Sequence, residues 1–186
     1  MSVKKTQFQK NTFYFFTITC YKWLYLFELT NFYDQIYNWF DILNTKRINI
    51  TAYVIMPNHL HCIIFYPEIE LNINNIIGTG KRFMAYELVK RLEKNNKKSI
   101  LKILEKGVSE PEMKRGKLHQ VFEPSFDLKV IDSEKFMIQK LNYIHYNPVS
   151  KKWNLVRDYR DYVYSSAGYY EKGISGRYEV IHYLET

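Results

Sequence analysis

The sequence predicts an α+β protein with a ferredoxin-like sandwich: an antiparallel sheet with helices on one face, plus an added tyrosine-bearing helix near the C-terminus. The first observation behind this prediction is the order of the segments. Stretches rich in β-branched and aromatic residues alternate with stretches of helical periodicity as strand, helix, strand, strand, helix, strand. The second is a two-residue turn signal, Pro57-Asn58, that joins the middle strands as a hairpin. The third is an amphipathic segment that follows the last strand.

The length fits one compact domain. The chain has 186 residues, of which 46% are hydrophobic, and this suffices for one core but not for two separate ones. We divide it into a basic N-terminal segment (1–10), a main domain (11–153) and an aromatic C-terminal tail (154–186). The formal net charge of +8 favours a polyanionic partner, although a solvated basic surface would have the same composition.

The first half of the chain supplies three strands and a helix. We expect strands over 11–21, 47–56 and 59–66, where Phe, Tyr, Thr and Ile are dense. Between the first two strands, residues 26–43 carry apolar side chains at helical spacing. The first strand is expected near the centre of the sheet.

The second half begins with a helix over 74–93. The glycines of Gly78-Thr79-Gly80 predict a bend there or a later helix start, and a phosphate-binding loop would need a different sequence. Residues 108–117 are polar and indicate a flexible loop. The last strand is expected over 120–130, where Pro124 restricts it to a sheet edge or a bulge.

Basic residues are concentrated between Lys81 and Lys106. Such a run is commonly a solvated helix face, but it equally suits a surface that follows a phosphate backbone. The DNA contacts predicted along the whole chain are Lys81, Arg82, Lys90, Arg91, Lys140, Lys151 and Lys152.

Two histidines open the third strand. In an extended segment, alternation places His59 and His61 on the same face, roughly 6–7 Å apart at the backbone. That arrangement suits two ligands of one metal ion. The competing interpretation is a pair of imidazoles at the mouth of a strand that only form hydrogen bonds.

A helix is predicted between Asp132 and Pro148, opened by an Asp-Ser cap signal. Tyr143 and Asn147 are one turn apart on it and share a face, so a hydroxyl and an amide point the same way. Lys140 lies one turn before Tyr143, where an ammonium would lower the phenol pKa or bind phosphate; a solvated lysine is the alternative. Tyr146 is a rival nucleophile that helix geometry does not exclude.

The motif Met56-Pro57-Asn58-His59-Leu60-His61-Cys62, followed by Tyr143-Ile144-His145-Tyr146-Asn147-Pro148-Val149, resembles the REP-associated tyrosine transposases. These are relatives of the small insertion-sequence transposases within the HUH single-strand endonuclease superfamily. The resemblance spans roughly residues 13–164. The segment Phe122–Asp127 departs from the family pattern, so no DNA contacts are carried over from it.

The resemblance implies roles for four residues. His59 and His61 match the paired metal ligands, Asn147 the polar residue that completes the metal site, and Tyr143 the nucleophile. It implies a metal-dependent endonuclease that cuts single-stranded or hairpin-associated DNA through a 5′-phosphotyrosine link, with magnesium or manganese as cofactor. Imidazole ligands alone would favour manganese or zinc. A homodimer with shared sites and a monomer both fit.

Two other classes stay open. A non-cleaving module that binds DNA or RNA hairpins would explain the charge and the exposed tyrosines. A phosphodiesterase that uses activated water would need only the histidine pair. Cys20 and Cys62 lie in apolar strand-like segments without a Cys-x-x-Cys spacing, which indicates reduced thiols rather than disulfides or a zinc ribbon. With no leader or membrane-spanning run, we expect a soluble cytoplasmic protein.

Overall fold

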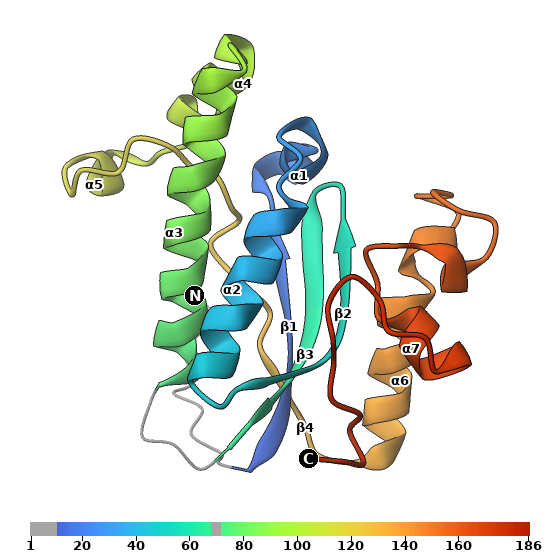
Figure 1. Cartoon of the computed structure of the whole chain (residues 1–186). Coiled ribbons are helices and arrows are strands. Elements are labelled where there is room, and N and C mark those ends of the chain that lie inside the picture. The colour runs from blue at the N-terminus through green and yellow to red at the C-terminus, as the bar shows by residue number, and fades with distance from the viewer. Residues whose placement is uncertain (1–10, 68–71) are drawn as a thin grey trace.

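The computed structural model describes residues 11–67 and 72–186, and the predicted basic segment 1–10 lies outside them. The chain order is β-α-β-β-α-β, followed by further helices (Figure 1). The strands are β1 (Thr12–Thr19), β2 (Asn49–Met56), β3 (His59–Tyr66) and β4 (Lys129–Ile131). The α-helices are α1 (Leu26–Leu29), α2 (Tyr33–Thr45), α3 (Ile73–Lys94), α4 (Lys98–Lys106), α5 (Glu110–Met113), α6 (Glu134–His145) and α7 (Ala167–Lys172). Short 3-10 turns are η1 (Tyr21–Trp23), η2 (Asn147–Val149) and η3 (Tyr159–Asp161).

The four strands form one antiparallel sheet in the order β2-β3-β1-β4. This confirms the predicted α+β fold class. Met56 pairs with His59, so the β2–β3 hairpin closes through the two residues Pro57 and Asn58. β1 lies in the interior of the sheet, between β3 and β4, as expected.

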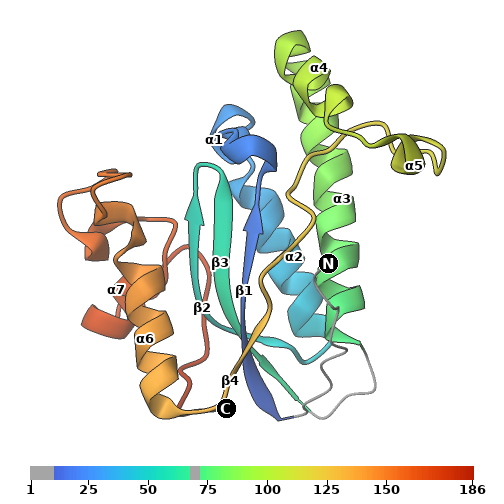
Figure 2. The same cartoon turned by 180° about the vertical axis from the view of Figure 1, so that it is seen from behind.

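Helices α2 and α3 cover one face of the sheet, whereas α6 covers the other (Figures 1 and 2). Alternate residues of β3 divide between the two layers. Cys62 and Ile64 join the larger core with α2 and α3, and Ile63 joins a second core on the α6 side. The second core also holds Phe15, Val54, Met137, Leu141 and Ile144. The added helix therefore has its own hydrophobic anchor on the sheet.

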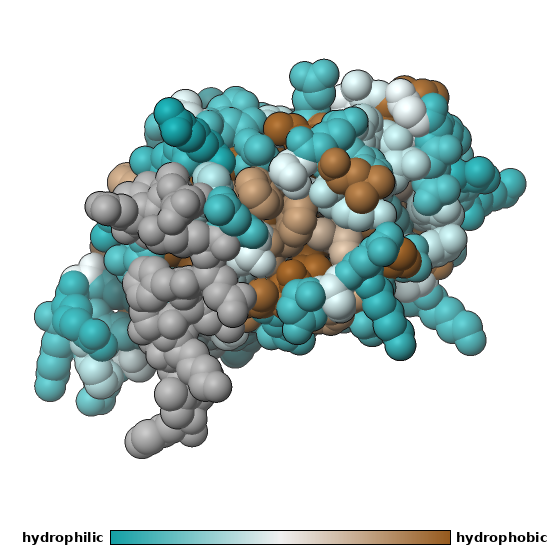
Figure 3. Space-filling view, turned by 90° about the horizontal axis from the view of Figure 1, so that it is seen from below, coloured by the Kyte–Doolittle hydropathy of each residue, from teal (hydrophilic) through white to brown (hydrophobic). Residues whose placement is uncertain are grey.

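The aromatic tail follows α6 and runs along the outer edge of β2. The Ile55 amide donates to the Tyr164 carbonyl, and the Ser166 amide donates to the Tyr53 carbonyl, at 2.8 and 3.0 Å. These bonds satisfy backbone groups that would otherwise be an open sheet edge. Seen from below, hydrophobic side chains show between hydrophilic ones at the lower end of the molecule (Figure 3).

Three local predictions were wrong. The glycines of 78–80 neither bend nor start the helix, because α3 begins at Ile73 under the Asn72 cap and continues through them. Gly80 is instead needed for packing, since a Cβ there would lie 2.3 Å from Trp39 Nε1. The predicted helix 26–43 is two helices, and the segment 108–117 contains the short helix α5.

The last predicted strand is also shorter than expected. Only Lys129–Ile131 of the segment 120–130 is a strand. The residues before it still follow β1 through single bonds: the Thr17 amide donates to the Phe126 carbonyl and the Glu123 amide to the Thr19 carbonyl. Within residues 11–67 and 72–186, none of the helices combines the length and apolar character that a membrane crossing requires.

Candidate active site

The two histidines lie on the α6 side of the sheet. Their ring centroids are 4.6 Å apart, and the side chains are almost fully buried, with 2% of His59 and 4% of His61 exposed. In the sheet, His59 is opposite Thr19 and His61 is opposite Thr17. The predicted common face is therefore confirmed.

Hydrogen bonds fix one nitrogen of each imidazole. Asn58 Oδ1 lies 2.7 Å from His59 Nδ1, and Thr17 Oγ1 lies 2.7 Å from His61 Nδ1. The amide nitrogen of Asn58 already donates to the Trp23 carbonyl at 2.7 Å, so the amide oxygen accepts a hydrogen bond from His59 Nδ1–H. This leaves His59 Nε2 with a free lone pair, the state that a metal ligand requires.

Burial keeps both imidazoles neutral. It lowers the pKa of His59 to about 3, and the charge of Lys152 lowers it further. Burial also holds the pKa of His61 well below its usual range, helped by His59 and Lys140. Neutral imidazole is the form that binds metals, so neither histidine must lose a proton at neutral pH to do so.

Helix α6 brings Tyr143 to the histidines. Ser133 caps the helix by accepting from the Phe136 amide, and the buried side of the helix packs on the sheet. The Tyr143 ring lies 4.9 Å from the His61 ring, while half of the tyrosine side chain is exposed. The phenol is thus close to the imidazoles and open to a large substrate.

Asn147 lies just beyond the helix. α6 ends at His145, and Asn147 begins the 3-10 turn η2 with Pro148. The predicted continuous helix through Asn147 is therefore two residues too long. The side-chain oxygen of Asn147 is buried and has no hydrogen-bond donor within the part of the chain that the structure describes. An unpaired buried amide oxygen is costly, unless a cation or a donor from a ligand meets it.

The four predicted residues meet in one cavity of about 350 Å³. Its lining is Trp23, His59, His61, Tyr143, Tyr146, Asn147, Ser150, Lys152 and Trp153.

The cavity fits a metal ion only in part. It offers two imidazoles and one unpaired amide oxygen, but its lining has no carboxylate. Across residues 11–67 and 72–186, no group of three or more His, Cys, Asp or Glu side chains could hold a metal. Three neutral ligands leave several positions to be filled, and phosphate oxygens of a nucleic acid are suitable ligands for magnesium or manganese.

The tyrosine is not activated by its surroundings alone. Burial raises the pKa of Tyr143 above its ordinary value, and Asp127 raises it further. The Lys140 ammonium lies over the rings of Phe15 and Tyr143, 4.3 and 5.4 Å from their centroids. A lysine near the tyrosine was predicted, but its charge is placed over the ring and does not lower this pKa.

Tyr146 lines the same cavity but faces another partner. Its ring is 4.2 Å from Tyr159 and, in the described part of the chain, forms no ring contact with either histidine. Tyr143 does form such a contact with His61. Of the two tyrosines, Tyr143 is therefore the one that the structure places against the histidine pair. The neighbouring His145 is buried and bonds to Ser166 Oγ at 2.9 Å.

The predicted DNA contacts separate by location. Lys152 lines the cavity, Lys140 lies beside Tyr143, and Lys151 is exposed next to Lys152. Arg82 and Lys90 are exposed on α3. This helix lies on the opposite face of the sheet from α6 (Figure 2).

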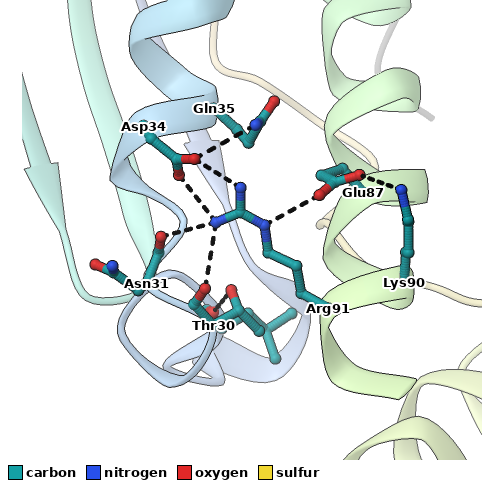
Figure 4. Close-up of polar contacts among 8 residues, drawn as sticks. Thr30, Asn31, Asp34, Gln35, Glu87, Lys90 and Arg91 are labelled. Carbon is teal, nitrogen blue, oxygen red and sulfur yellow. Dashed lines mark hydrogen bonds and ion pairs between the residues drawn. The ribbon is translucent and has the colours of Figure 1, made fainter. Parts of the chain in front are cut away.

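Lys81 and Arg91 are bound within the protein instead. The Lys81 ammonium donates to the carbonyls of Glu123, Pro124 and Ser125, and burial lowers its pKa to about 8. Arg91 joins α3 to the start of α2 (Figure 4) through Asp34 and the carbonyls of residues 30 and 31. It also pairs with Glu87 on its own helix.

Sequence reasoning missed several side chains at the site. Thr17 and Trp23 are distant from both motifs, Trp153 follows the second motif by four residues, and no sequence pattern connects any of the three to the histidines. Asn58 is different, because it directly precedes His59 and its amide could have been considered as a partner of the imidazole. The pairing of β1 with β3 is what brings Thr17 beside His61.

The fold and the cavity define a ferredoxin-like α+β protein that carries paired histidines, a tyrosine and an amide at one site. No protein-family model matches the chain. In sequence it is similar to an uncharacterised protein of Haemophilus influenzae, with 27% identity over 159 residues that cover 79% of this chain and 86% of that protein. In structure it is similar to a REP-associated tyrosine transposase bound to a REP hairpin. The TM-score is 0.60 and the identity 18%, over 100% of this chain and 96% of the other. This likeness confirms the resemblance at the level of the fold.

Proposed function

We propose that this protein is a metal-dependent single-stranded DNA endonuclease and strand transferase, which cleaves hairpin-associated DNA through a 5′-phosphotyrosine link to Tyr143. The observation that carries the proposal is the position of the Tyr143 ring, 4.9 Å from His61 and in one cavity with His59 and Asn147. The transposase of similar fold is bound to a DNA hairpin, which supports the same class of substrate.

The reaction is a transesterification. The Tyr143 phenol oxygen attacks the scissile phosphorus and loses its proton, the bond from phosphorus to the 3′-oxygen breaks, and that oxygen takes up a proton. The products are a 5′-phosphotyrosine and a free 3′-hydroxyl. In the reverse step a 3′-hydroxyl attacks the same phosphorus and the phenol leaves, so the strands are joined without nucleotide hydrolysis.

Several residues in and around the cavity have a part in this step. His59, His61 and Asn147 would hold a magnesium or manganese ion, which would polarise the scissile phosphate as a Lewis acid. Asn58 and Thr17 orient the imidazoles. The ammonium groups of Lys140 and Lys152, which form no ion pair with the described residues, lie over the rings of Tyr143 and Trp23 and would attract the phosphates that flank the cleaved bond.

The test is covalent capture of the DNA. Protein is incubated with 3′-labelled hairpin DNA that has a single-stranded extension, with magnesium or manganese, and the products are separated on a denaturing gel. We expect a labelled protein band that disappears in Tyr143→Phe and with chelator, but persists in Tyr146→Phe. A protein that only binds hairpins would shift DNA without forming the band. A phosphodiesterase that uses water would release cut DNA with no band, and either result would reject the proposal.

A further inference from the structure

Trp23 is displayed at the cavity by an unusual backbone. Lys22 and Trp23 have φ values of 51° and 57°, in the left-handed region that bulky side chains rarely adopt. Three bonds hold this turn: the Lys22 amide donates to Glu123 Oε1, the Trp23 amide to the Cys20 carbonyl, and Asn58 to the Trp23 carbonyl. Backbone strain of this kind is concentrated at functional sites. Here the strained turn carries an indole that is 48% exposed.

The Trp23 indole lies beside the histidines. Its ring centroid is 5.5 Å from that of His59, which also contacts Trp153 at 5.4 Å. The same Asn58 side chain orients His59 and holds the Trp23 carbonyl. Thus the backbone that carries the indole is held in place relative to His59.

A cation lies over this indole. Lys152 Nζ is 4.1 Å from the Trp23 ring centroid and 5.2 Å from that of Trp153. No acidic side chain pairs with Lys152 in the part of the chain that the structure describes, and the cavity lining has none. The site therefore combines a flat aromatic surface with an unpaired positive charge.

We propose that Trp23 and Lys152 form a nucleotide subsite, in which an unpaired base next to the scissile phosphate stacks on the indole and its phosphate pairs with the ammonium. The long lysine stem lets the ammonium leave the indole face for the phosphate when the base enters. A base in a duplex has both faces covered, so the subsite selects single strands. An acidic peptide lacks the stacking face, and a basic partner would be repelled by Lys152. The inference rests on the proposed function, because it places this base beside the cleaved bond.

Binding without cleavage tests the subsite. Affinity is measured in chelator with Tyr143→Phe protein and a labelled hairpin that has a single-stranded extension. We expect Trp23→Leu to weaken binding by about fivefold or more, Trp23→Phe to restore part of it, and the exposed Phe83→Leu on α3 to change nothing. One abasic nucleotide at the stacked position should abolish the effect of Trp23→Leu. Equal affinity of Trp23→Leu and parent, or a loss that no abasic position removes, would overturn the subsite.

The lysine has its own readout. Lys152→Gln should reduce the slope of log affinity against log salt by about 0.7, as expected for one phosphate contact on a single strand, whereas the exposed Lys46→Gln should not. An unchanged slope in Lys152→Gln would remove the lysine from the subsite.

Fluorescence keeps the test valid if Trp23→Leu is unstable. In a Trp153→Phe protein only Trp23 and the buried Trp39 remain, so quenching by the oligonucleotide reports on Trp23. We expect quenching by the intact strand and little by the strand with the abasic nucleotide; none with either would overturn the subsite. All of these measurements omit the metal and the nucleophile. If the protein forms no covalent adduct with DNA but gives the expected binding, salt-slope and fluorescence results, the proposed function is rejected and the subsite stands.

Discussion

The hydrogen bond from Thr17 to His61 allows a controlled perturbation of the candidate metal site. Thr17→Val removes a hydroxyl 2.7 Å from His61 Nδ1 and keeps the shape of the side chain. Thr19→Val is the matched control. Thr19 is two residues further along β1, opposite His59, and its hydroxyl forms no hydrogen bond with the described residues.

The size of the effect follows from burial. With only 4% of His61 exposed, water cannot replace the lost partner, so an unsatisfied nitrogen should cost about 1–3 kcal/mol of folding free energy. Loss of a hydrogen bond behind a ligating histidine typically lowers metal affinity about 10- to 100-fold. This corresponds to roughly 1.4–2.8 kcal/mol of binding free energy.

The assay is a calorimetric titration with Mn²⁺ in the presence of hairpin DNA. All proteins carry Tyr143→Phe so that the DNA stays uncut, and urea unfolding is measured for each of them. We expect Thr17→Val to bind Mn²⁺ more weakly by this factor, and Thr19→Val to bind like the parent. If Thr17→Val binds Mn²⁺ as tightly as the parent, or if both variants weaken it equally, the proposed role of Thr17 is refuted.

Three further predictions concern the scaffold. Gly80→Ala should destabilise the protein by about 1–3 kcal/mol in urea unfolding, because the new Cβ would lie 2.3 Å from Trp39 Nε1. Gly78→Ala, which meets no atom within 4 Å, should stabilise it by about 1 kcal/mol; equal effects would contradict the packing. Burial lowers the pKa of His145 to about 4, so the unfolded chain binds more protons between pH 6.5 and 4. Lowering the pH from 6.5 to 4 should therefore reduce stability by about 1.4 kcal/mol per pH unit through this group, and His145→Gln should show a smaller slope; an identical slope would refute it. Arg91→Ala should lower the urea midpoint but leave the salt dependence of DNA binding unchanged, since Arg91 is bound internally; a reduced salt slope would show that it contacts DNA.

Much of the candidate site followed from two short periodicities. Alternation along β3 correctly put His59 and His61 on one face, because side chains in a strand alternate regardless of the rest of the fold. Helical spacing likewise placed Tyr143 near the end of α6. It failed for Asn147, which lies two residues beyond the end of α6, since Pro148 follows and the chain tightens into a 3-10 turn.

The remaining features depend on contacts between distant segments. Composition alone marks Lys81 as a DNA contact, yet three backbone carbonyls from the segment after Gln120 surround its ammonium. Gly80 suggests a helix break until Trp39 is seen packed against it. Trp23 enters the site only because the turn after β1 and the β2–β3 hairpin meet at Asn58. No local pattern in the sequence encodes such pairings.

The most direct measurement identifies the residue that carries the DNA. After reaction with hairpin DNA and nuclease trimming, trypsin should release residues 141–151, which contain both Tyr143 and Tyr146, as one peptide. Fragmentation in a mass spectrometer then locates the attached nucleotide. The account predicts a 5′-phosphotyrosine at Tyr143. A nucleotide on Tyr146, or an unmodified peptide from protein that has cut its substrate, would contradict it.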